Sequence, residues 1–291
     1  MLQEKVIIIT GASSGIGAAL ARLLARKKAR VVIAARRAKL LHDLVDEIRR
    51  GGGTAEAVPA DVTDPGQAER LIAATVDRFG RLDVLVNNAG RGHFASVEDT
   101  TDAVIANMFA VNVYALWHTT RPAVRQMKRQ GSGLIVNIAS MAGKLGFPFN
   151  RAYVAAKHAC VGFTHALRME LLGTNIHATV ICPGSVKTEW AEVTEGGPML
   201  AMFSASGPIV KRIPAEQHLP LPPVEGVLSS EVVAGRIVEV IENPSPEAYT
   251  HRGAEDFVRL AATDRAEAER HQLAVALGEK EVYQRLAPPK V

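Results

Sequence analysis

Short runs of aliphatic and β-branched residues alternate with longer helical patterns, and this alternation constrains the fold more than any other feature of the chain. Apolar runs predict strands at Val6–Thr10, Arg30–Ala34, Thr54–Val58, Val84–Asn87, Gly133–Ile138 and Asn175–Ile181. Helical patterns lie between them at Gly15–Lys28, Leu40–Arg50, Asp64–Phe79, Thr101–Arg129 and Tyr153–Leu172. Strands that are apolar throughout are typical of a parallel sheet covered by helices on both faces. The sequence therefore predicts an α/β fold with a Rossmann-type, doubly wound parallel sheet.

The pattern becomes irregular after Thr188. The stretch Trp190–Gly226 contains six prolines and little periodicity. So long a loop within a compact domain is usually a functional lid or a disordered insertion. We favour a lid over the substrate, with a mobile surface insertion as the alternative. Its apolar residues include Trp190, Met199, Met202 and Phe203.

The last part of the chain predicts a helix at Ser229–Glu242, a short strand near Glu247–Thr250 and a charged, helix-prone tail at Glu255–Leu286. We expect the tail to pack on the domain or on another subunit. Pro122 should bend or divide the long helix Thr101–Arg129. The predicted organisation is one catalytic domain at residues 1–253, with the lid at 189–226, and a C-terminal helical extension at residues 254–291.

The charge balance argues against several classes of partner. The 34 basic and 30 acidic residues give a net charge of +4, which is too small to indicate nucleic acid or an anionic membrane. No apolar run approaches the roughly 20 residues of a membrane span, and the strand at Val6 leaves no room for a signal peptide. We therefore expect a cytoplasmic protein. Cys160 and Cys182 are expected to be core thiols, and the histidines lack the spacing of metal ligands, so no metal is predicted.

A glycine-rich segment, Thr10-Gly-Ala-Ser-Ser-Gly-Ile-Gly17, joins the first predicted strand to the first helix. Glycines let the backbone turn tightly and approach a phosphate, which the N–H groups of the helix N-terminus bind. The segment is not a P-loop, because the Gly-Lys-Ser/Thr ending is missing. The candidate cofactor-binding residues here are Gly11, Ser13, Ser14, Gly15, Ile16 and Gly17.

The same segment also fits Gly-x-Ser-x-Gly, the nucleophile elbow of α/β-hydrolases, with Ser13 as the nucleophile. Such elbows usually follow several strands, whereas this one follows the first. No His-Gly-Gly-type oxyanion segment is visible either. A hydrolase is therefore the less favoured alternative.

The end of the second predicted strand indicates which dinucleotide binds. A carboxylate at this point would hydrogen-bond the ribose 2′-hydroxyl of NAD, but the chain reads Ala34-Ala35-Arg36-Arg37. Two guanidinium groups can hold a 2′-phosphate. The alternative is that Arg36 and Arg37 are ordinary surface charge. The sequence favours NADP(H) over NAD(H).

Tyr153 and Lys157 lie four residues apart on a predicted helix, with Ser140 upstream. Side chains at this spacing share one helix face, with Cβ atoms roughly 5–6 Å apart. A free tyrosine has a pKa of about 10, and lowering it to about 7 takes roughly 4 kcal/mol of preference for the phenolate. A nearby ammonium acts in that direction, and a serine hydroxyl can hold the oxygen that exchanges the proton. The alternative is a buried tyrosine beside a solvated lysine.

Together these motifs resemble the short-chain dehydrogenase/reductase family. Further matching segments are Asp61-Val62, Asn87-Asn-Ala-Gly90, Asn112 and Pro183-Gly184-Ser-Val186-Lys-Thr188. The resemblance is strong over residues 5–190 and weak over 229–250. It implies an oxidoreductase that interconverts a ketone or aldehyde and an alcohol by hydride transfer. The additional cofactor contacts that it implies are Asp61, Val62, Asn88, Ala89, Gly90, Tyr153, Lys157, Pro183, Gly184, Val186 and Thr188.

The resemblance also implies a role for each catalytic residue. Tyr153 is the expected general acid in reduction and base in oxidation, and Ser140 orients the substrate oxygen. Lys157 lowers the pKa of Tyr153 and binds the nicotinamide ribose, while Asn112 holds a water that links Lys157 to solvent. Family members that use NADP often carry an arginine at the position of Arg36. A second basic residue that some of them carry is replaced here by Ser14.

The resemblance also bears on the substrate and on assembly. The expected pocket walls are His93, Phe94, Phe147, Phe149 and Trp190, which suit an apolar ketone or secondary alcohol. Family members are commonly dimers or tetramers, so a homodimer or homotetramer is expected. A non-catalytic NADPH-binding sensor or scaffold is the alternative, although such a protein does not need the complete set of Ser140, Tyr153 and Lys157.

Overall fold

The computed structural model describes residues 2–192, 194–195, 205, 209, 212–213 and 216–286. Much of the predicted lid therefore lies outside the described residues, including Met199, Met202 and Phe203.

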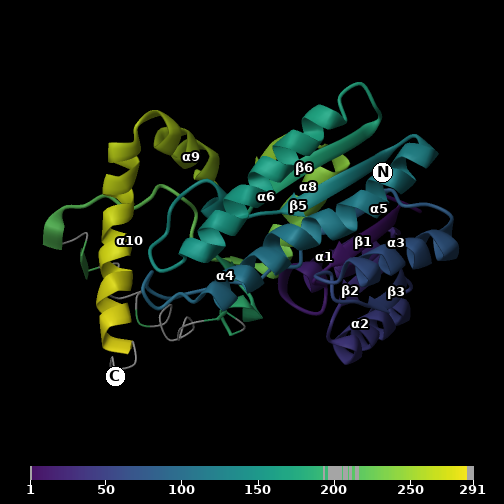
Figure 1. Cartoon of the computed structure of the whole chain (residues 1–291), viewed down its shortest axis with the longest axis horizontal. Helices are drawn as coiled ribbons and strands as arrows, with labels where there is room; N and C mark the ends of the chain where they lie inside the picture. Colours follow the sequence, from purple (N-terminus) through teal and green to yellow (C-terminus); the bar gives the residue numbers. More distant parts are fainter. Residues whose placement is uncertain are drawn as a thin grey trace.

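Seven parallel strands form the centre of the molecule (Figure 1), in the order β3-β2-β1-β4-β5-β6-β9. Their bounds are β1 (Val6–Thr10), β2 (Arg30–Ala35), β3 (Thr54–Pro59), β4 (Val84–Asn87), β5 (Gly133–Ile138), β6 (Ile176–Cys182) and β9 (Glu247–Tyr249). The strand order reverses between β1 and β4. In sheets of this kind a ligand binds beyond the carboxyl ends of the strands at that switch point. Each predicted strand is confirmed to within one residue.

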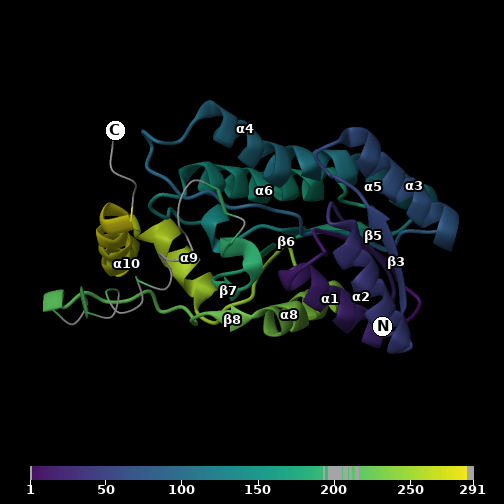
Figure 2. The ribbon, with the colours of Figure 1, turned by 90° about the horizontal axis from the view of Figure 1, so that it is seen from below.

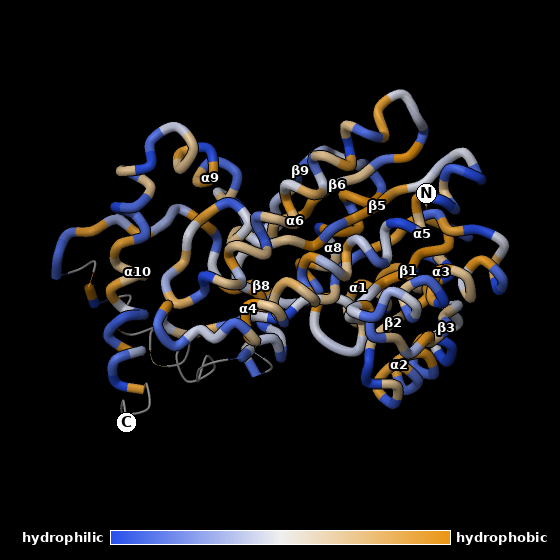
Figure 3. The backbone as a smooth tube through the Cα atoms, in the orientation of Figure 1, coloured by the Kyte–Doolittle hydropathy of each residue, from blue (hydrophilic) through white to orange (hydrophobic). Residues whose placement is uncertain are grey.

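Helices cover both faces of the sheet, as the edge-on view in Figure 2 shows. One layer contains α1 (Gly15–Arg26), α2 (Ala38–Arg50) and α8 (Ser230–Glu242), and the other contains α3 (Pro65–Phe79), α5 (Ala115–Gln130) and α6 (Arg151–Glu170). Alternate residues of β1 pack into the hydrophobic cores on the two faces of the sheet. Ile7 and Ile9 face the first layer of helices, and Ile8 faces the second. The hydrophobic colour in Figure 3 accordingly follows the central strands. The predicted doubly wound α/β fold is confirmed.

The long helix predicted at Thr101–Arg129 is divided, but not at Pro122. The structure has α4 (Asp102–Phe109), a π-helical turn at Ala110–Tyr114 and then α5, and Pro122 is a buried residue inside α5. A π-helical turn inserts an extra residue into a helix and is frequent at functional sites. Here the turn contains Asn112, a proposed catalytic residue. The helix is therefore interrupted at Asn112 and not at Pro122.

The C-terminal tail forms α9 (Ala254–Thr263) and α10 (Arg265–Leu286). Phe257 of α9 packs against the segment that follows β5, and Tyr283 of α10 stacks on Phe149 with ring centroids 4.3 Å apart. Figures 1 and 2 place α10 at the opposite end of the molecule from α2 and α3. The tail thus packs on its own domain. A two-stranded sheet, β7 (Val186–Lys187) and β8 (Leu228–Ser229), joins the two ends of the irregular stretch.

Within the described ranges, no helix is both long and apolar enough to span a membrane.

Candidate active site

The glycine turn lies between β1 and α1, against the residues that follow β4. A Cβ atom on Gly11 would lie 2.7 Å from the Cα of Ala89, and one on Gly17 would lie 2.6 Å from Nδ2 of Asn88. The Asn88 amide donates a hydrogen bond to the carbonyl of Thr10 at 2.9 Å. The missing side chains therefore let the ends of β1 and β4 meet, which forms a backbone cradle at the switch point of the sheet.

Arg37 reaches the two serines of this turn. Its Nη2 donates to Ser13 Oγ at 2.9 Å and to Ser14 Oγ at 2.7 Å, and its Nη1 lies 3.4 Å from a carboxylate oxygen of Glu189. Arg36 is exposed. The hydrolase alternative fails on this geometry, because Ser13 contacts a guanidinium, which donates protons to hydrogen bonds but cannot accept one as a base.

Asp61 and Val62 follow β3 on the same side of the sheet. Asp61 Oδ1 accepts hydrogen bonds from the amide and the hydroxyl of Thr63 at 2.9 and 2.7 Å. Val62 is buried, and its carbonyl lies 3.2 Å from Nδ1 of His118. These contacts fix the loop that the resemblance assigns to the adenine side of the cofactor.

Ser140 follows β5 and begins a 3₁₀ turn at Met141–Gly143, where its Oγ accepts a hydrogen bond from the Ala142 amide at 3.1 Å. Tyr153 lies on the first turn of α6, close enough to Ser140 for the serine hydroxyl to lower the pKa of its phenol. The two residues, 13 positions apart in the sequence, thus meet beyond the carboxyl end of β5.

Lys157 lies one turn further along α6, with Nζ 5.7 Å from the centre of the Tyr153 ring. Its ammonium donates a hydrogen bond to the carbonyl of Ile138 at 2.9 Å. A Cβ atom on Gly90 would lie 3.0 Å from Oδ1 of Asn112 and 3.4 Å from Nζ of Lys157. Glycine at this position therefore leaves room for Asn112 and Lys157 to face the same point.

Asn112 carries an unsatisfied acceptor at that point. Its Nδ2 donates to the carbonyls of Arg91 and Met108 at 3.1 and 3.0 Å, while its buried Oδ1 has no partner among the described residues. A buried polar atom without a partner is costly, so such an atom indicates a bound water or ligand group. This feature and the glycine cradle fit a nicotinamide dinucleotide.

The expectation that the pKa of Tyr153 falls toward neutrality is wrong for this structure. Burial raises the pKa of Tyr153 to about 12, against the opposing effect of its hydrogen bond with Ser140. Burial also lowers the pKa of Lys157. Desolvation disfavours the charged form of each group, and the sequence does not show how deeply the two side chains are buried.

The expected substrate residues divide into two groups. The ring of Trp190 lies 5.3 Å from that of Tyr153, and a Cβ atom on Gly92 would lie 2.2 Å from the indole. Phe94, Phe149 and Trp190 share one apolar cluster with α10. His93, next to Phe94, is buried and neither of its ring nitrogens has a described partner. Phe147 instead packs with α9.

The segment Pro183–Thr188 lies beside these groups. The carbonyl of Pro183 accepts hydrogen bonds from Met141 N at 2.8 Å and Ser140 Oγ at 3.4 Å. A Cβ atom on Gly15 would lie 3.2 Å from the side chain of Thr188. The segment therefore runs from the catalytic serine to the glycine turn.

Sequence reasoning missed two residues that support this site, His251 and Asn137. His251, which follows β9, hydrogen-bonds the amide of Gly184 and the carbonyl of Ser185. Asn87 and Asn137 join β4 to β5 through a 2.9 Å side-chain hydrogen bond, and Asn137 donates another to Thr164 of α6 at 2.9 Å. A signal for the asparagines was available in the sequence, because each is a polar residue in an otherwise apolar strand. No sequence pattern points to His251.

The described part of the chain contains no group of three or more acidic, histidine or cysteine side chains placed to hold a metal ion. Cys160 on α6 and Cys182 in β6 are both free and buried.

Comparison with known proteins agrees with this geometry. The sequence model of a family described as short chain dehydrogenase matches residues 5–196. The ketoacyl reductase HetN of Nostoc sp. is 34% identical over 251 residues, which are 86% of this chain and 80% of that protein. A D-beta-hydroxybutyrate dehydrogenase of Rhizobium meliloti is 40% identical over 65% of this chain and 74% of its own length. A crystal structure of a short chain dehydrogenase/reductase from Burkholderia phymatum, in complex with NAD, superposes with a TM-score of 0.78 at 29% identity, covering 91% of this chain and 95% of that one.

Proposed function

This chain belongs to the short-chain dehydrogenase/reductase family, and on that premise we propose that it interconverts a ketone or aldehyde and an alcohol with NADP(H), using Tyr153 as acid and base. The observation that carries the proposal is the meeting of Ser140 and Tyr153 with Lys157 one helical turn away. Membership of the family indicates an NAD(P)-dependent oxidoreductase.

Tyr153 and Ser140 both act on the oxygen atom of the substrate. In reduction, the Tyr153 phenol donates its proton to the substrate oxygen, and the Ser140 hydroxyl holds that oxygen by a hydrogen bond. The bound nicotinamide supplies or accepts the hydride. We propose that a proton returns to Tyr153 by way of Lys157 and Oδ1 of Asn112. A pKa of about 12 keeps the phenol protonated at neutral pH, as a proton donor requires.

The preference for NADP(H) is supported by Arg37. Arg37 follows the end of β2, where an acidic residue would select NAD, and its guanidinium lies at the serines of the glycine turn. Arg36 was the expected family arginine, and we now propose that Arg37 binds the 2′-phosphate. The Kd of NADPH should rise about tenfold in Arg37→Ala, with a smaller change in Arg36→Ala and little change for NADH in either. Equal changes for both cofactors would contradict this preference.

The test of catalysis is oxidation of NADPH in the presence of ketones, aldehydes and 3-oxoacyl compounds. Tyr153→Phe should lower kcat by about 10²–10⁴-fold, the usual contribution of a general acid, while the Kd of NADPH stays the same. Undiminished turnover in Tyr153→Phe would reject the mechanism. Absence of turnover on the whole panel, with NADPH still bound, would favour a sensor.

The aromatic wall of Phe94, Phe149 and Trp190 supports an apolar substrate body. Two relatives of the chain are a ketoacyl reductase and a D-beta-hydroxybutyrate dehydrogenase, which makes oxo and hydroxy groups on acyl chains the first candidates. We propose that Trp190, which lies in the described part of residues 189–226, covers Tyr153. Trp190→Ala should raise KM for apolar carbonyls more than it changes the Kd of NADPH.

We also propose a homodimer or homotetramer formed through α5 and α6. Trp117 of α5 and Met169 of α6 are exposed apolar side chains, and Tyr114 and Leu172 are exposed just before α5 and just after α6. Exposed apolar patches mark protein interfaces. Sedimentation should give more than one chain per particle, and Trp117→Glu with Met169→Glu should shift the population toward the monomer.

A further inference from the structure

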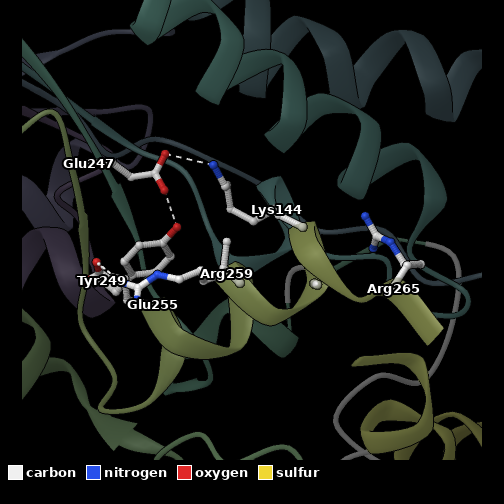
Figure 4. A pocket seen from close by; sticks show the side chains of 9 residues that line it. Lys144, Glu247, Tyr249, Glu255, Arg259 and Arg265 are labelled. Carbon is white, nitrogen blue, oxygen red and sulfur yellow. Dashed lines mark hydrogen bonds and ion pairs between the residues drawn. The ribbon is translucent and has the colours of Figure 1, made fainter. Parts of the chain in front are cut away.

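A second pocket, of about 270 Å³, lies between α9 and the turn that begins at Ser140. Figure 4 shows side chains from β9, from the turn and from α9 converging on it. Its lining residues are Lys144, Glu247, Tyr249, Glu255, Val258, Arg259, Ala261, Ala262 and Arg265. None of them is a proposed catalytic or cofactor-binding residue. Val258 and Ala261 are buried and give the pocket an apolar wall.

The carboxylates of this pocket already have partners. Glu247 accepts hydrogen bonds from the Tyr249 hydroxyl and from Nζ of Lys144, the latter at 3.0 Å, and His165 Nε2 lies 3.2 Å from the same carboxylate. Burial alone would raise the pKa of Glu247, but the bonds to Tyr249 and Lys144 outweigh it and lower that pKa. Glu255 pairs with Arg259 at 3.2 Å.

The cations, in contrast, have hydrogen-bond donors to spare. Lys144 directs one of its N–H groups to Glu247, and an ammonium has three. Arg265, drawn at the far side of the pocket in Figure 4, makes no hydrogen bond or ion pair with a residue in the described ranges. A guanidinium offers five N–H donors in a planar fork that matches a carboxylate. The pocket therefore has spare donors and few spare acceptors.

We propose that this pocket binds a short-chain carboxylate, with its anionic group held by Arg265 and its apolar chain against Val258 and Ala261. The volume of about 270 Å³ suits a small acid. Lys144 ends the turn that Ser140 begins, so the site adjoins the active site without sharing its residues. The proposal does not depend on the proposed reaction.

The test is calorimetric titration of the full chain with sodium butyrate at constant ionic strength, with acetate and inorganic phosphate as comparison ligands. We expect saturable binding of one butyrate, tighter than acetate because the extra methylenes contact the apolar wall. Arg265→Gln should weaken butyrate binding about tenfold, the scale of a charge-assisted hydrogen-bond pair. Arg270→Gln, an exposed arginine of α10 that pairs with Glu267 outside the pocket, should bind as the wild type does.

Several outcomes would overturn the proposal. They are no saturable butyrate binding, equal weakening in Arg265→Gln and Arg270→Gln, or binding of phosphate alone. Displacement of butyrate by NADPH would place the ligand in the cofactor site instead. Because Arg265 is exposed, its substitution should leave the unfolding temperature measured without ligand unchanged, which checks that a loss of binding is not a loss of folding.

Discussion

The imidazole of His251 lies directly against the backbone of Gly184. Its Nδ1 accepts a hydrogen bond from the Gly184 amide at 3.0 Å, and its Nε2 donates one to the Ser185 carbonyl at 3.0 Å. A Cβ atom on Gly184 would lie 3.0 Å from the ring. Only the neutral tautomer with its hydrogen on Nε2 can make both bonds. A residue beyond the last strand thus fixes the segment that we propose meets the nicotinamide.

We predict that His251→Phe, which keeps a ring but removes both hydrogen bonds, raises the Kd of the cofactor about tenfold, the cost of leaving buried backbone groups unpaired. Fluorescence titration with NADPH measures it. Burial lowers the pKa of His251, against the opposing effect of the Ser185 carbonyl. The wild type should therefore lose affinity only at a pH below the ordinary histidine pKa of about 6.5, as protonation removes the acceptor at Nδ1.

The control is His42→Phe, at an exposed position on α2, which should leave both the Kd and its pH dependence unchanged. Charged groups near His251 oppose each other, because Glu225 favours the imidazolium and Arg236 disfavours it. If His251→Phe retained the wild-type loss of affinity in acid, another group would be responsible.

His251 also shows what sequence reasoning could not reach. The strands and the glycine turn were predictable, because each is encoded by neighbouring residues through periodicity or spacing. The contact between Gly184 and His251 joins residues 67 positions apart and depends on where β9 ends. The pKa of Tyr153 was mispredicted for a related reason, since spacing places a lysine nearby but does not give the burial of the phenol.

Replacement of glycine by alanine should change the free energy of unfolding in opposite directions at Gly17, in the glycine turn, and at Gly235, on α8. In a helix, replacing glycine by alanine normally stabilises by about 0.5–1 kcal/mol. At Gly17, however, the new Cβ would lie 2.6 Å from Asn88 Nδ2 and 2.7 Å from the Gly11 carbonyl. Gly17→Ala should therefore lower the free energy of unfolding by about 1–3 kcal/mol and abolish measurable NADPH binding.

Gly235→Ala on α8 is the matched control for Gly17→Ala, because its Cβ would meet nothing within 4 Å. It should raise the free energy of unfolding in urea denaturation and leave NADPH binding unchanged. A Gly17→Ala protein that binds NADPH normally would show that the close approach of β1 and β4 is not needed.

Asp83, which precedes β4 at the amino ends of the strands, gives a prediction for stability. Its buried carboxylate accepts hydrogen bonds from the Val6 amide at 2.9 Å and from Arg81 Nη2 at 2.6 Å, and Lys5 Nζ lies at 3.2 Å. Burial alone would raise the pKa of Asp83, but these partners lower it. Since the folded-state pKa is below the unfolded value of about 3.9, its stabilisation is complete above that pH and is lost as pH falls further.

Asp83→Asn should therefore lower the free energy of unfolding by about 2–3 kcal/mol at neutral pH. The difference from the wild type should shrink below about pH 4. Asp43→Asn removes an exposed pair with Lys39 and should change stability by less than about 0.5 kcal/mol. Urea denaturation at neutral and acid pH measures both. Equal losses in the two variants would mean that burial of Asp83 adds nothing.

The raised pKa of Tyr153 predicts different pH profiles for the two directions of the reaction. In reduction the phenol must be protonated, and a pKa of about 12 keeps it so. The rate of carbonyl reduction should therefore stay level between about pH 6 and pH 9. In oxidation the phenolate is the base, and the positive charge of the oxidised nicotinamide lowers the pKa of a neighbouring phenol. The rate of alcohol oxidation should therefore rise with pH.

Measurement of kcat/KM in both directions across this pH range tests the assignment, because kcat/KM reports the protonation state of the complex that meets the substrate. Ser140→Ala removes the hydrogen bond that lowers the pKa of Tyr153, so its rise in oxidation should be displaced to higher pH. The same variant should leave reduction level over the range, with a lower plateau. A decline of wild-type reduction centred near neutrality would instead mean that the phenol ionises there, and that Lys157 controls its pKa after all.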